Sequence, residues 1–398
     1  MKTKIIYFST YCEKSVFQEI FTKSLKKSGN AIQKFHGLIV NGLARQNTNY
    51  VDVVSSIPVS HSTHKKLVWH FPSAKTNNIE YHYVPILNIF GLKNIFVFIY
   101  SYFYILFLRS NKKSFKIVLI LDALTLSISL GALLSSRLRK IPCVSIVTDA
   151  PGLGIYSTGL FEKVKNKIIN SIISRYDGYV FATKQMDSRF NIFNKPFMVM
   201  EGLVDYSMCD VKNELSKKHE EKIIMYAGGI SERYGIKLLL EAFLLINDPL
   251  ARLHIYGSGA KECNLHYFQE LDIRVKFKGV VDNDIVVEEQ LRATLLVNPR
   301  PTHEEFTEYS FPSKNLEYMV SGTPTVTTLL PGMPEEYYNY VYILDDETVS
   351  GYYSVINDLI NRPRNELHDF GARAKEFILN NKNNIIQTKK ITDFINNV

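Results

Sequence analysis

The segment 298–328 carries the residues with the clearest chemistry in the chain. It follows a short apolar run and leads into another, which predicts a strand, a short helix and a second strand. Within it, Pro312 suits the first position of a helix, and Gly322 with Pro324 ends that helix and turns the chain. The backbone N–H groups at the start of such a helix can bind an anion.

Lys314 falls in the first turn of this expected helix, where the helix dipole disfavours a positive charge. An anion in front of the helix, such as a pyrophosphate group, removes that penalty. The alternative is an ion pair with Glu317, three residues later on the same helix face. The residues alone leave both interpretations open.

A second phosphate site is expected early in the other half of the chain. The apolar run 223–226 is followed by Gly228 and Gly229, and a helical pattern covers 236–245. Glycines between a strand and a helix let the backbone approach phosphate oxygens closely. Gly257 begins a further Gly-x-Gly turn, but Glu262 stands where a dinucleotide-binding fingerprint has its third glycine, which disfavours an NAD enzyme.

In the first half of the chain, the strand expected over 142–147 ends in Thr148 and Asp149. Open α/β sheets bind ligands beyond the carboxyl ends of their strands, so Asp149 is a candidate active-site carboxylate. The alternative is that Asp149 caps the turn that follows it.

Several of these residues together resemble the retaining glycosyltransferases of group 1 (family 4), and most closely the bacterial capsule and exopolysaccharide members. The resemblance rests on three runs that are similar to the donor-sugar loop of that family: Ser310-Phe311-Pro312-Ser313-Lys314, Glu317-Tyr318-Met319 and Gly322-Thr323-Pro324. It implies the GT-B fold, in which two Rossmann-like domains face each other and a C-terminal helix crosses back to the first domain. At the level of motifs, the resemblance is specific from about residue 223 to 328.

The resemblance also implies roles for single residues. The family has two glutamates eight positions apart, and Glu317 matches the second, which holds the nucleotide ribose. Tyr309 stands where the first glutamate contacts the sugar. The arginine and lysine that the family commonly places on the diphosphate fall on Ile230 and Tyr234.

The full set of candidate site residues combines these matches. Arg233 is the cation nearest to the two lost positions, and we expect it to act with Lys314 on the diphosphate. Asp149 matches the aspartate of a family turn that faces the transferred sugar, and it completes the candidate catalytic group. The candidate nucleotide-binding residues are Gly228, Gly229, Gly257, Gly279, Val280, Tyr309, Ser310, Phe311, Pro312, Ser313 and Glu317.

No metal or other cofactor is expected. Asp282-Asn283-Asp284 has the Asp-x-Asp pattern of manganese sites in the other glycosyltransferase fold, but it precedes an expected helix and is interpreted as an N-cap. The resemblance implies a metal-independent enzyme whose substrate is a nucleoside-diphosphate sugar, linked to UDP or GDP.

The elements that position these residues alternate strands with helices in both halves, which predicts an α/β protein with parallel sheets. At 398 residues the chain is too long for one core. We expect an acceptor-binding domain over 1–205, a linker over 206–221 and a nucleotide-sugar-binding domain over 222–379. A tail from about 380 to 398 is expected to pack back on the first domain.

The cysteines and the N-terminal residues indicate in which cellular compartment the protein is expected. Four widely separated cysteines without a Cys-x-x-Cys pair indicate neither a disulfide framework nor a zinc site, and they fit a reducing cytoplasm. The first residues, MKTKIIYFST, predict a strand rather than a signal peptide.

Positive charge is concentrated in the first half of the chain. Residues 1–200 contain 26 Lys and Arg and 9 Asp and Glu, a balance of +17, whereas the remaining residues have a balance of −9. A basic half favours anionic surfaces such as lipid headgroups or nucleic acid, and a solvated basic surface is the alternative. A lipid-linked acceptor would explain both this charge and the aromatic segment 95–108 in the same half, so we favour the lipid surface.

Residues 95–108 are apolar on every face, rich in aromatic residues and flanked by Lys93, Arg109, Lys112 and Lys113. The segment is shorter than the ~20 residues that span a bilayer. We expect a helix buried in the first domain. The alternative is a helix lying in a membrane interface, where tyrosines and flanking cations belong.

Together these features predict a retaining hexosyltransferase that moves a sugar from a nucleoside diphosphate to a lipid-linked saccharide in bacterial surface polysaccharide synthesis. We expect it in the cytoplasm, peripherally associated with the inner face of the cell membrane and without a nucleic-acid partner. One alternative is a sugar-nucleotide epimerase on the same fold. The other is a degenerate transferase that acts as a non-catalytic binding subunit.

Overall fold

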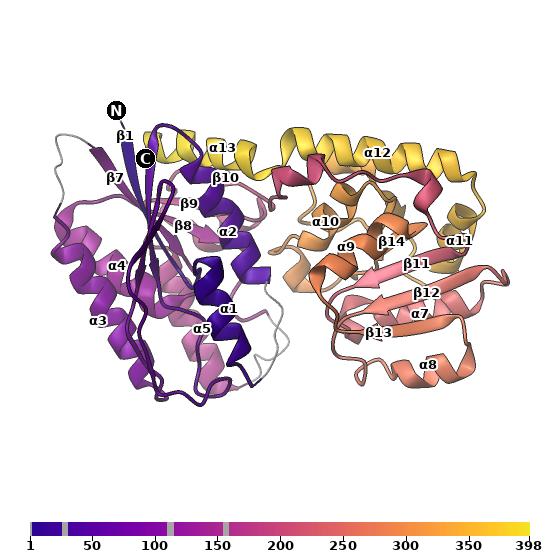
Figure 1. The fold of residues 1–398 in the computed structure, drawn as a ribbon, viewed down its shortest axis with the longest axis horizontal. Coiled ribbons are helices and arrows are strands. Elements are labelled where there is room, and N and C mark those ends of the chain that lie inside the picture. Colours follow the sequence, from indigo (N-terminus) through magenta and orange to yellow (C-terminus); the bar gives the residue numbers. More distant parts are fainter. Residues whose placement is uncertain (1, 26–30, 110–114, 154–158) are drawn as a thin grey trace. The chain divides into compact units, whose positions relative to one another are not determined.

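The computed structural model describes residues 2–25, 31–109, 115–153 and 159–398, and the chain forms two compact units (Figure 1). Unit 1 comprises Met1–Met200 and Asn384–Val398, and unit 2 comprises Glu201–Asn383. Each unit has a mainly parallel sheet with helices, so the predicted α/β class is confirmed.

The sheet of unit 1 has the strand order β10-β9-β8-β7-β1-β2-β5-β4. Neighbouring strands are parallel except at the β4 edge, where β4 is antiparallel to β5. The strands are β1 (Lys2–Ser9), β2 (Asn49–Ser55), β4 (Ala74–Thr76), β5 (Ile79–Tyr83), β7 (Phe115–Asp122), β8 (Cys143–Val147), β9 (Gly178–Phe181) and β10 (Phe197–Val199). A separate antiparallel pair consists of β3 (Val68–Trp69) and β6 (Ile86–Leu87). The central strands β1 and β7 contain continuous apolar, buried runs, Ile5 to Phe8 and Ile117 to Leu121, as in parallel sheets covered on both faces.

The helices of unit 1 are α1 (Lys14–Thr22), α2 (Ala31–Ala44), α3 (Leu92–Leu106), α4 (Leu126–Arg139), α5 (Leu160–Ile173), α6 (Met186–Phe190) and α13 (Asn384–Asn397). Helix α13 packs on α2, and Gly42 permits this contact because a Cβ there would lie 2.5 Å from the carbonyl oxygen of Asn384. The C-terminal helix therefore belongs to unit 1.

Helix α3 corrects one expectation of the sequence analysis. It lies beside α4 (Figure 1), but it buries only one narrow stripe, namely Val97, Ser101 and Ile105. Its other face exposes large apolar side chains, and exposure continues into the residues on both sides: Phe90, Leu92, Ile95, Phe96, Ile99, Phe103 and Phe107. A helix that is apolar all round gives no sequence signal for which face is covered, so the expectation of a buried helix was wrong.

The ends of α3 are held by two cations, Lys93 from the flank named in the sequence analysis and Arg139 from the end of α4. Lys93 donates to the carbonyl oxygen of Val59, and Arg139 donates to the carbonyl oxygens of Leu106 (2.6 Å) and Leu108 (2.9 Å). Lys112 and Lys113 lie outside the described residues. None of the helices in the described ranges combines the length and hydropathy needed to cross a bilayer.

The sheet of unit 2 is fully parallel, with the order β13-β12-β11-β14-β15-β16. The strands are β11 (Lys222–Ala227), β12 (Ala251–Tyr256), β13 (Val275–Gly279), β14 (Leu295–Asn298), β15 (Thr325–Thr328) and β16 (Tyr342–Leu344). The helices are α7 (Ile236–Leu244), α8 (Leu265–Leu271), α9 (Asn283–Arg292), α10 (Ser313–Ser321), α11 (Val349–Ile360) and α12 (Arg364–Asn381). Five 3₁₀ turns join them: η1 (Tyr206–Cys209), η2 (Leu215–Lys217), η3 (Glu232–Tyr234), η4 (Glu305–Thr307) and η5 (Glu335–Tyr340).

Strands β11 and β14 are the topological switch point of this sheet. From β11 the chain proceeds outward through β12 and β13, and it then returns to β14 and proceeds the other way through β15 and β16. Open α/β sheets bind ligands beyond the carboxyl ends of the strands at such a point. The ends of β11 and β14 therefore mark the first place to look for a site in unit 2.

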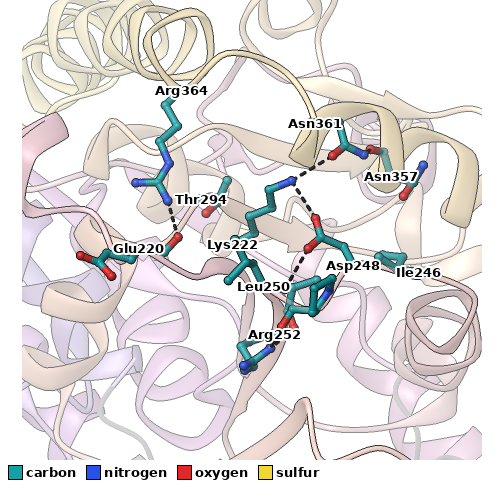
Figure 2. A network of polar contacts seen from close by, with 12 residues as sticks. Glu220, Lys222, Ile246, Asp248, Leu250, Arg252, Thr294, Asn357, Asn361 and Arg364 are labelled. Atoms are coloured by element: carbon teal, nitrogen blue, oxygen red, sulfur yellow. Dashed lines mark hydrogen bonds and ion pairs between the residues drawn. The ribbon is translucent and has the colours of Figure 1, made fainter.

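The amino end of β11 is fixed by a polar network (Figure 2). Lys222 Nζ donates to Asp248 (2.7 Å) and Asn361 (2.9 Å), and Arg364 donates to the carbonyl oxygen of Glu220. These contacts join β11 to the loop before β12 and to the start of α12. They stabilise the sheet at the end opposite the switch-point site.

The segment 206–221, expected as a linker, lies in unit 2, where it contains η1 and η2. The tail expected from about residue 380 corresponds to α13, which begins at Asn384 after α12 ends at Asn381. The boundary between the two units falls between these helices.

Candidate active site

Glycine turns end three neighbouring strands of unit 2. Gly228 and Gly229 follow β11, Gly257 follows β12, and Gly279 ends β13. The Gly228 N–H donates to the carbonyl oxygen of Tyr256 (2.9 Å), and the Gly257 N–H donates to that of Gly279 (2.8 Å). Gly257 has a φ of +132°, and a Cβ there would lie 1.7 Å from the Gly228 oxygen, so the turns approach too closely for any other residue.

Lys314 extends from the first turn of α10 over the first of these turns. Its Nζ donates to Tyr226 Oη (2.8 Å), and it lies 4.7 Å from the centre of the Tyr226 ring and 5.5 Å from that of Tyr234. A Cβ at position 228 would lie 2.0 Å from Lys314 Cε, so Gly228 makes room for the lysine. The structure thus brings together the helix start and the glycine turn that the sequence analysis treated separately.

The surroundings of Lys314 disfavour its positive charge. Burial lowers the pKa of Lys314 to about 8, the charge of Arg300 contributes to the lowering, and Glu317 opposes it. Its direct hydrogen-bond partner, Tyr226, is a neutral phenol whose pKa is raised by burial. A bound anion would favour the charged form of this lysine.

Helix α10 is fixed to the end of β11 by Tyr318. Its fully buried hydroxyl accepts from the Ala227 N–H (2.8 Å) and lies 3.3 Å from the Ala227 oxygen. The helix begins at Ser313, so Pro312 is the N-cap rather than the first helical residue, because its ψ of 110° is extended. Gly322 ends the helix in the left-handed conformation, as predicted.

Arg233, the cation expected beside Lys314, is engaged elsewhere. Its Nε and Nη2 donate to Glu304 Oε2 at 3.1 Å and 2.7 Å, and its guanidinium lies 4.9 Å from the Phe306 ring centre. The position that the family fills with arginine, Ile230, is in the hydrophobic core. Arg233 therefore has its charge balanced by Glu304.

Arg300 is a residue that the sequence analysis missed. It follows β14 at the switch point, and its guanidinium lies 4.4 Å from the Phe306 ring centre and 5.8 Å from that of Tyr234. Lys314 Nζ lies 5.5 Å from the centre of the same Tyr234 ring, so the two cations share one locality. The signal that could have found it is its position just beyond the carboxyl end of a strand, by the rule that drew attention to Asp149.

The loop before α10 contains candidates with different surroundings. Ser310 is buried and its Oγ donates to a backbone oxygen of η4 (2.9 Å), while the Phe311 ring packs against Tyr337 with a centroid separation of 5.3 Å. These two side chains hold the loop in place. Ser313 is exposed and Glu317 is half-buried, one helical turn further along α10.

The remaining nucleotide-binding candidates lie at the edges of the site. Val280, directly after β13, is 69% exposed, and the preceding Gly279 has a φ of +71°. Tyr309 is half-buried and follows η4. Exposed apolar surface at Val280 suits the face of a nucleotide base.

Asp149 lies in unit 1, exposed and two residues after the end of β8. The neighbouring strand β7 ends in a second carboxylate, Asp122, which the sequence analysis did not single out. Asp122 is buried, and it lies 3.5 Å from His36 Nε2, whose Nδ1 is 2.6 Å from Tyr7 Oη. Burial raises the pKa of Asp122, but His36 and hydrogen bonds from Thr125 and a backbone N–H outweigh burial and hold this pKa below its usual value.

Two acidic groups bear on metal binding. Asp282 is the N-cap of α9, as predicted, although it caps through its backbone oxygen rather than its side chain. In the part of the chain that the structure describes, one group has metal-like spacing, formed by Asp52, Glu80 and His82 of unit 1. Lys4 Nζ lies 2.6 Å from Asp52, so the lysine already pairs with one of the two carboxylates of this group.

Residues 210–377 match the family model described as "Glycosyl transferases group 1". The match covers most of unit 2, less than half of the whole chain, and includes every candidate residue from Gly228 to Glu317. Unit 2 is therefore similar to group 1 glycosyltransferase domains. A comparison with the sequences of curated proteins gives no match.

The fold of the whole chain is similar to solved structures. Sucrose-phosphate synthase from Thermosynechococcus elongatus has a TM-score of 0.67 at 14% identity, with 98% of each chain covered. Alr3699/HepE of Anabaena, in complex with UDP and glucose, has a TM-score of 0.62 at 12% identity, with 100% of each chain covered. The lipopolysaccharide outer core galactosyltransferase WaaB has a TM-score of 0.61 at 14% identity, with 99% of each chain covered. These likenesses confirm the predicted GT-B fold.

Proposed function

We propose that this protein is a glycosyltransferase that moves a sugar from a nucleoside diphosphate, UDP- or GDP-linked, to a saccharide acceptor. The observation that carries the proposal is Lys314, held by the start of α10 over the glycine turn at Gly228, at the switch point of the unit 2 sheet. This arrangement supplies a partly buried cation, a helix N-terminus and close backbone approach at one place, which suits a diphosphate.

The chemistry follows from where charge develops. When the bond between the sugar C1 and the diphosphate oxygen breaks, its electron pair stays on the diphosphate, which gains negative charge. Lys314 and the N–H groups of the first turn of α10 stabilise that charge, and α10 is fixed by Tyr318, so they need not reorganise. Glu317, one turn later, takes the ribose in the role that the resemblance implies.

Retention of the sugar's configuration and independence from metal are inferred from the family resemblance. Asp149 is assigned to the reaction on the same basis, since it stands where the family's strand-end turn has an aspartate. Asp149→Asn is expected to preserve folding and nucleotide binding while turnover falls. Turnover equal to that of the wild type would mean that Asp149 only caps the turn.

The proposed acceptor is a saccharide of bacterial surface polysaccharide synthesis, at the inner face of the cell membrane. A named relative on the same fold is a lipopolysaccharide outer core galactosyltransferase, and another was solved with UDP and glucose. The first supports a surface-glycan acceptor for this chain, and the second supports a nucleotide-sugar donor.

A lipid-linked acceptor and peripheral membrane binding are supported by unit 1. Its exposed apolar face on α3 includes Phe96, Phe103 and Phe107, which are 48%, 45% and 69% exposed. Residues 1–200 carry a net charge of +17. An aromatic face inserts shallowly into a membrane interface, and the cations meet anionic headgroups at about 1 kcal/mol for each well-placed residue.

The experiment that tests the proposed function is product analysis with the purified protein and a panel of UDP- and GDP-sugars. A transferase releases the nucleoside diphosphate and free sugar slowly when water replaces the acceptor. An epimerase converts the donor into a different sugar nucleotide and releases no diphosphate. A non-catalytic subunit leaves every donor unchanged, and either of these two results would overturn the proposal.

A further inference from the structure

The site has lost the two cations that the related family places on the diphosphate. Ile230 is 2% exposed and contributes to the core of unit 2, and Tyr234 offers a ring instead of a lysine. The nearest cation in sequence, Arg233, donates twice to Glu304. Lys314 alone would then face a ligand that carries two phosphates.

The Tyr234 ring lies close to two cations. Lys314 Nζ lies 5.5 Å from its centre and the Arg300 guanidinium 5.8 Å, so one ring is shared by two cations from different elements. The Phe306 ring, 6.2 Å from that of Tyr234, lies 4.4 Å from the guanidinium of Arg300. Arg300 is thus held by aromatic faces on a short loop after β14.

Two cations on one ring repel each other, and partial burial increases the repulsion. The aromatic faces offset part of this cost through cation–π attraction. An anion that contacts both cations would lower the repulsion further, and a diphosphate has the charge to do so.

We propose that Arg300 is a diphosphate-binding residue that acts with Lys314 and replaces the cations lost at Ile230 and Tyr234. Tyr234 and Phe306 are its positioning residues. The inference rests on the proposed nucleotide-sugar donor and names the groups that hold it. A guanidinium suits this task because its planar N–H groups bind two phosphate oxygens at once.

The test is isothermal calorimetry of UDP, GDP and the matching monophosphates with the wild type, Arg300→Gln and Arg300→Lys. Arg300→Gln is expected to weaken diphosphate binding roughly 10- to 100-fold, the loss of a charge-assisted hydrogen bond. Monophosphate binding is expected to change much less. Arg300→Lys keeps the charge without the bidentate geometry and is expected to fall between the wild type and Arg300→Gln.

The matched control is Arg362→Gln. The Arg362 guanidinium also lies close to a tyrosine ring, 5.5 Å from that of Tyr342, but it follows α11 and is paired with Asp358. Arg362→Gln is expected to bind as the wild type does. Thermal unfolding establishes whether each variant is folded. If Arg300→Gln does not fold, the comparison of Arg300→Lys with the wild type tests the inference.

The outcomes separate this inference from the proposed function. Unchanged diphosphate affinity in a folded Arg300 variant overturns the inference and leaves the transferase proposal standing. A wild type that binds and needs Arg300, yet releases no sugar from any donor, overturns the transferase proposal and leaves the inference standing. A wild type that binds no nucleoside diphosphate overturns both.

Discussion

Lys314 shows how single residues of this site depend on one another. Its position over the end of β11 requires a glycine at 228, its Nζ is held by the Tyr226 hydroxyl, and its charge is disfavoured by burial and by Arg300. Its local sequence position indicated an anion site, and the structure adds a physical reason why an anion would bind there. The partners come from β11 and from the loop after β14, so they could not be identified from spacing along the chain.

The lowered pKa of Lys314, about 8, makes nucleotide binding depend on pH. A diphosphate favours the charged lysine, so affinity should be constant below pH 8 and fall by up to about tenfold per pH unit above it. The phosphates do not contribute to this slope, since their last ionisation, with a pKa of about 6, is complete. Calorimetry from pH 7 to 10 measures it, and proton uptake on binding should appear at pH 8.5.

Lys314→Arg is the control for this prediction, because an arginine remains charged throughout the range. Its affinity should show no fall between pH 8 and 10. The same slope in the wild type and in Lys314→Arg would mean that Lys314 is not the titrating group.

At the scale of elements, sequence and structure agree best where local punctuation is strong. Gly322 ends α10 as expected, and the apolar runs before Gly228 and Asp149 are strands. The partner of Arg233 could not be predicted, because Glu304 is 71 residues away along the chain and no pattern links the two. The exposed face of α3 was mispredicted for the reason that an all-apolar helix has no polar face to mark its surroundings.

The contact between α10 and β11 depends on Tyr318, whose hydroxyl accepts from the half-buried Ala227 N–H. Tyr318→Phe leaves that N–H without this acceptor and should lower the free energy of unfolding by about 1–3 kcal/mol. Nucleotide binding should weaken as well, since the helix that carries Lys314 is loosened. Chemical denaturation and calorimetry measure the two effects.

Tyr340→Phe is the matched control, because it removes a hydroxyl from η5 while its ring stays stacked on Phe377 at 4.3 Å. It should change neither stability nor binding by a comparable amount. Equal free energies of unfolding for the two variants would show that the Tyr318 hydrogen bond does not anchor the helix.

At the scale of the whole molecule, the two units differ in charge and in surface. Residues 1–200 have a net charge of +17 and contain the exposed apolar face of α3, while the remaining residues have a net charge of −9 and contain the glycine turns and Lys314. This division suits an enzyme in which one unit meets an acceptor at a lipid surface and the other binds the donor.

The membrane role of α3 is tested by co-sedimentation with vesicles that contain phosphatidylglycerol. The wild type should bind at low ionic strength and dissociate as salt screens the charges. The double variant Phe96→Ser with Phe103→Ser should lose most of this binding. A double variant of unit 2, Leu271→Ser with Ile273→Ser, removes two side chains of similar or greater exposure (53% and 79%) and should bind as the wild type does.

Failure of the wild type to bind anionic vesicles at low salt would contradict the membrane role. Equal binding by the α3 variant would assign any membrane contact to another surface. Neither result would affect the donor site in unit 2.

The central claim is that α10 and the glycine turn of β11 bind the nucleoside diphosphate of a sugar donor, and calorimetry of Glu317→Ala tests it most directly. UDP or GDP should bind the wild type, and Glu317→Ala should lose about 1.5–3 kcal/mol of binding free energy, the range for a hydrogen bond to a charged group. Glu366→Ala on α12, whose carboxylate pairs with Arg362, is the control and should bind normally. A folded Glu317→Ala with the wild-type affinity for the nucleotide would contradict the assignment of this site.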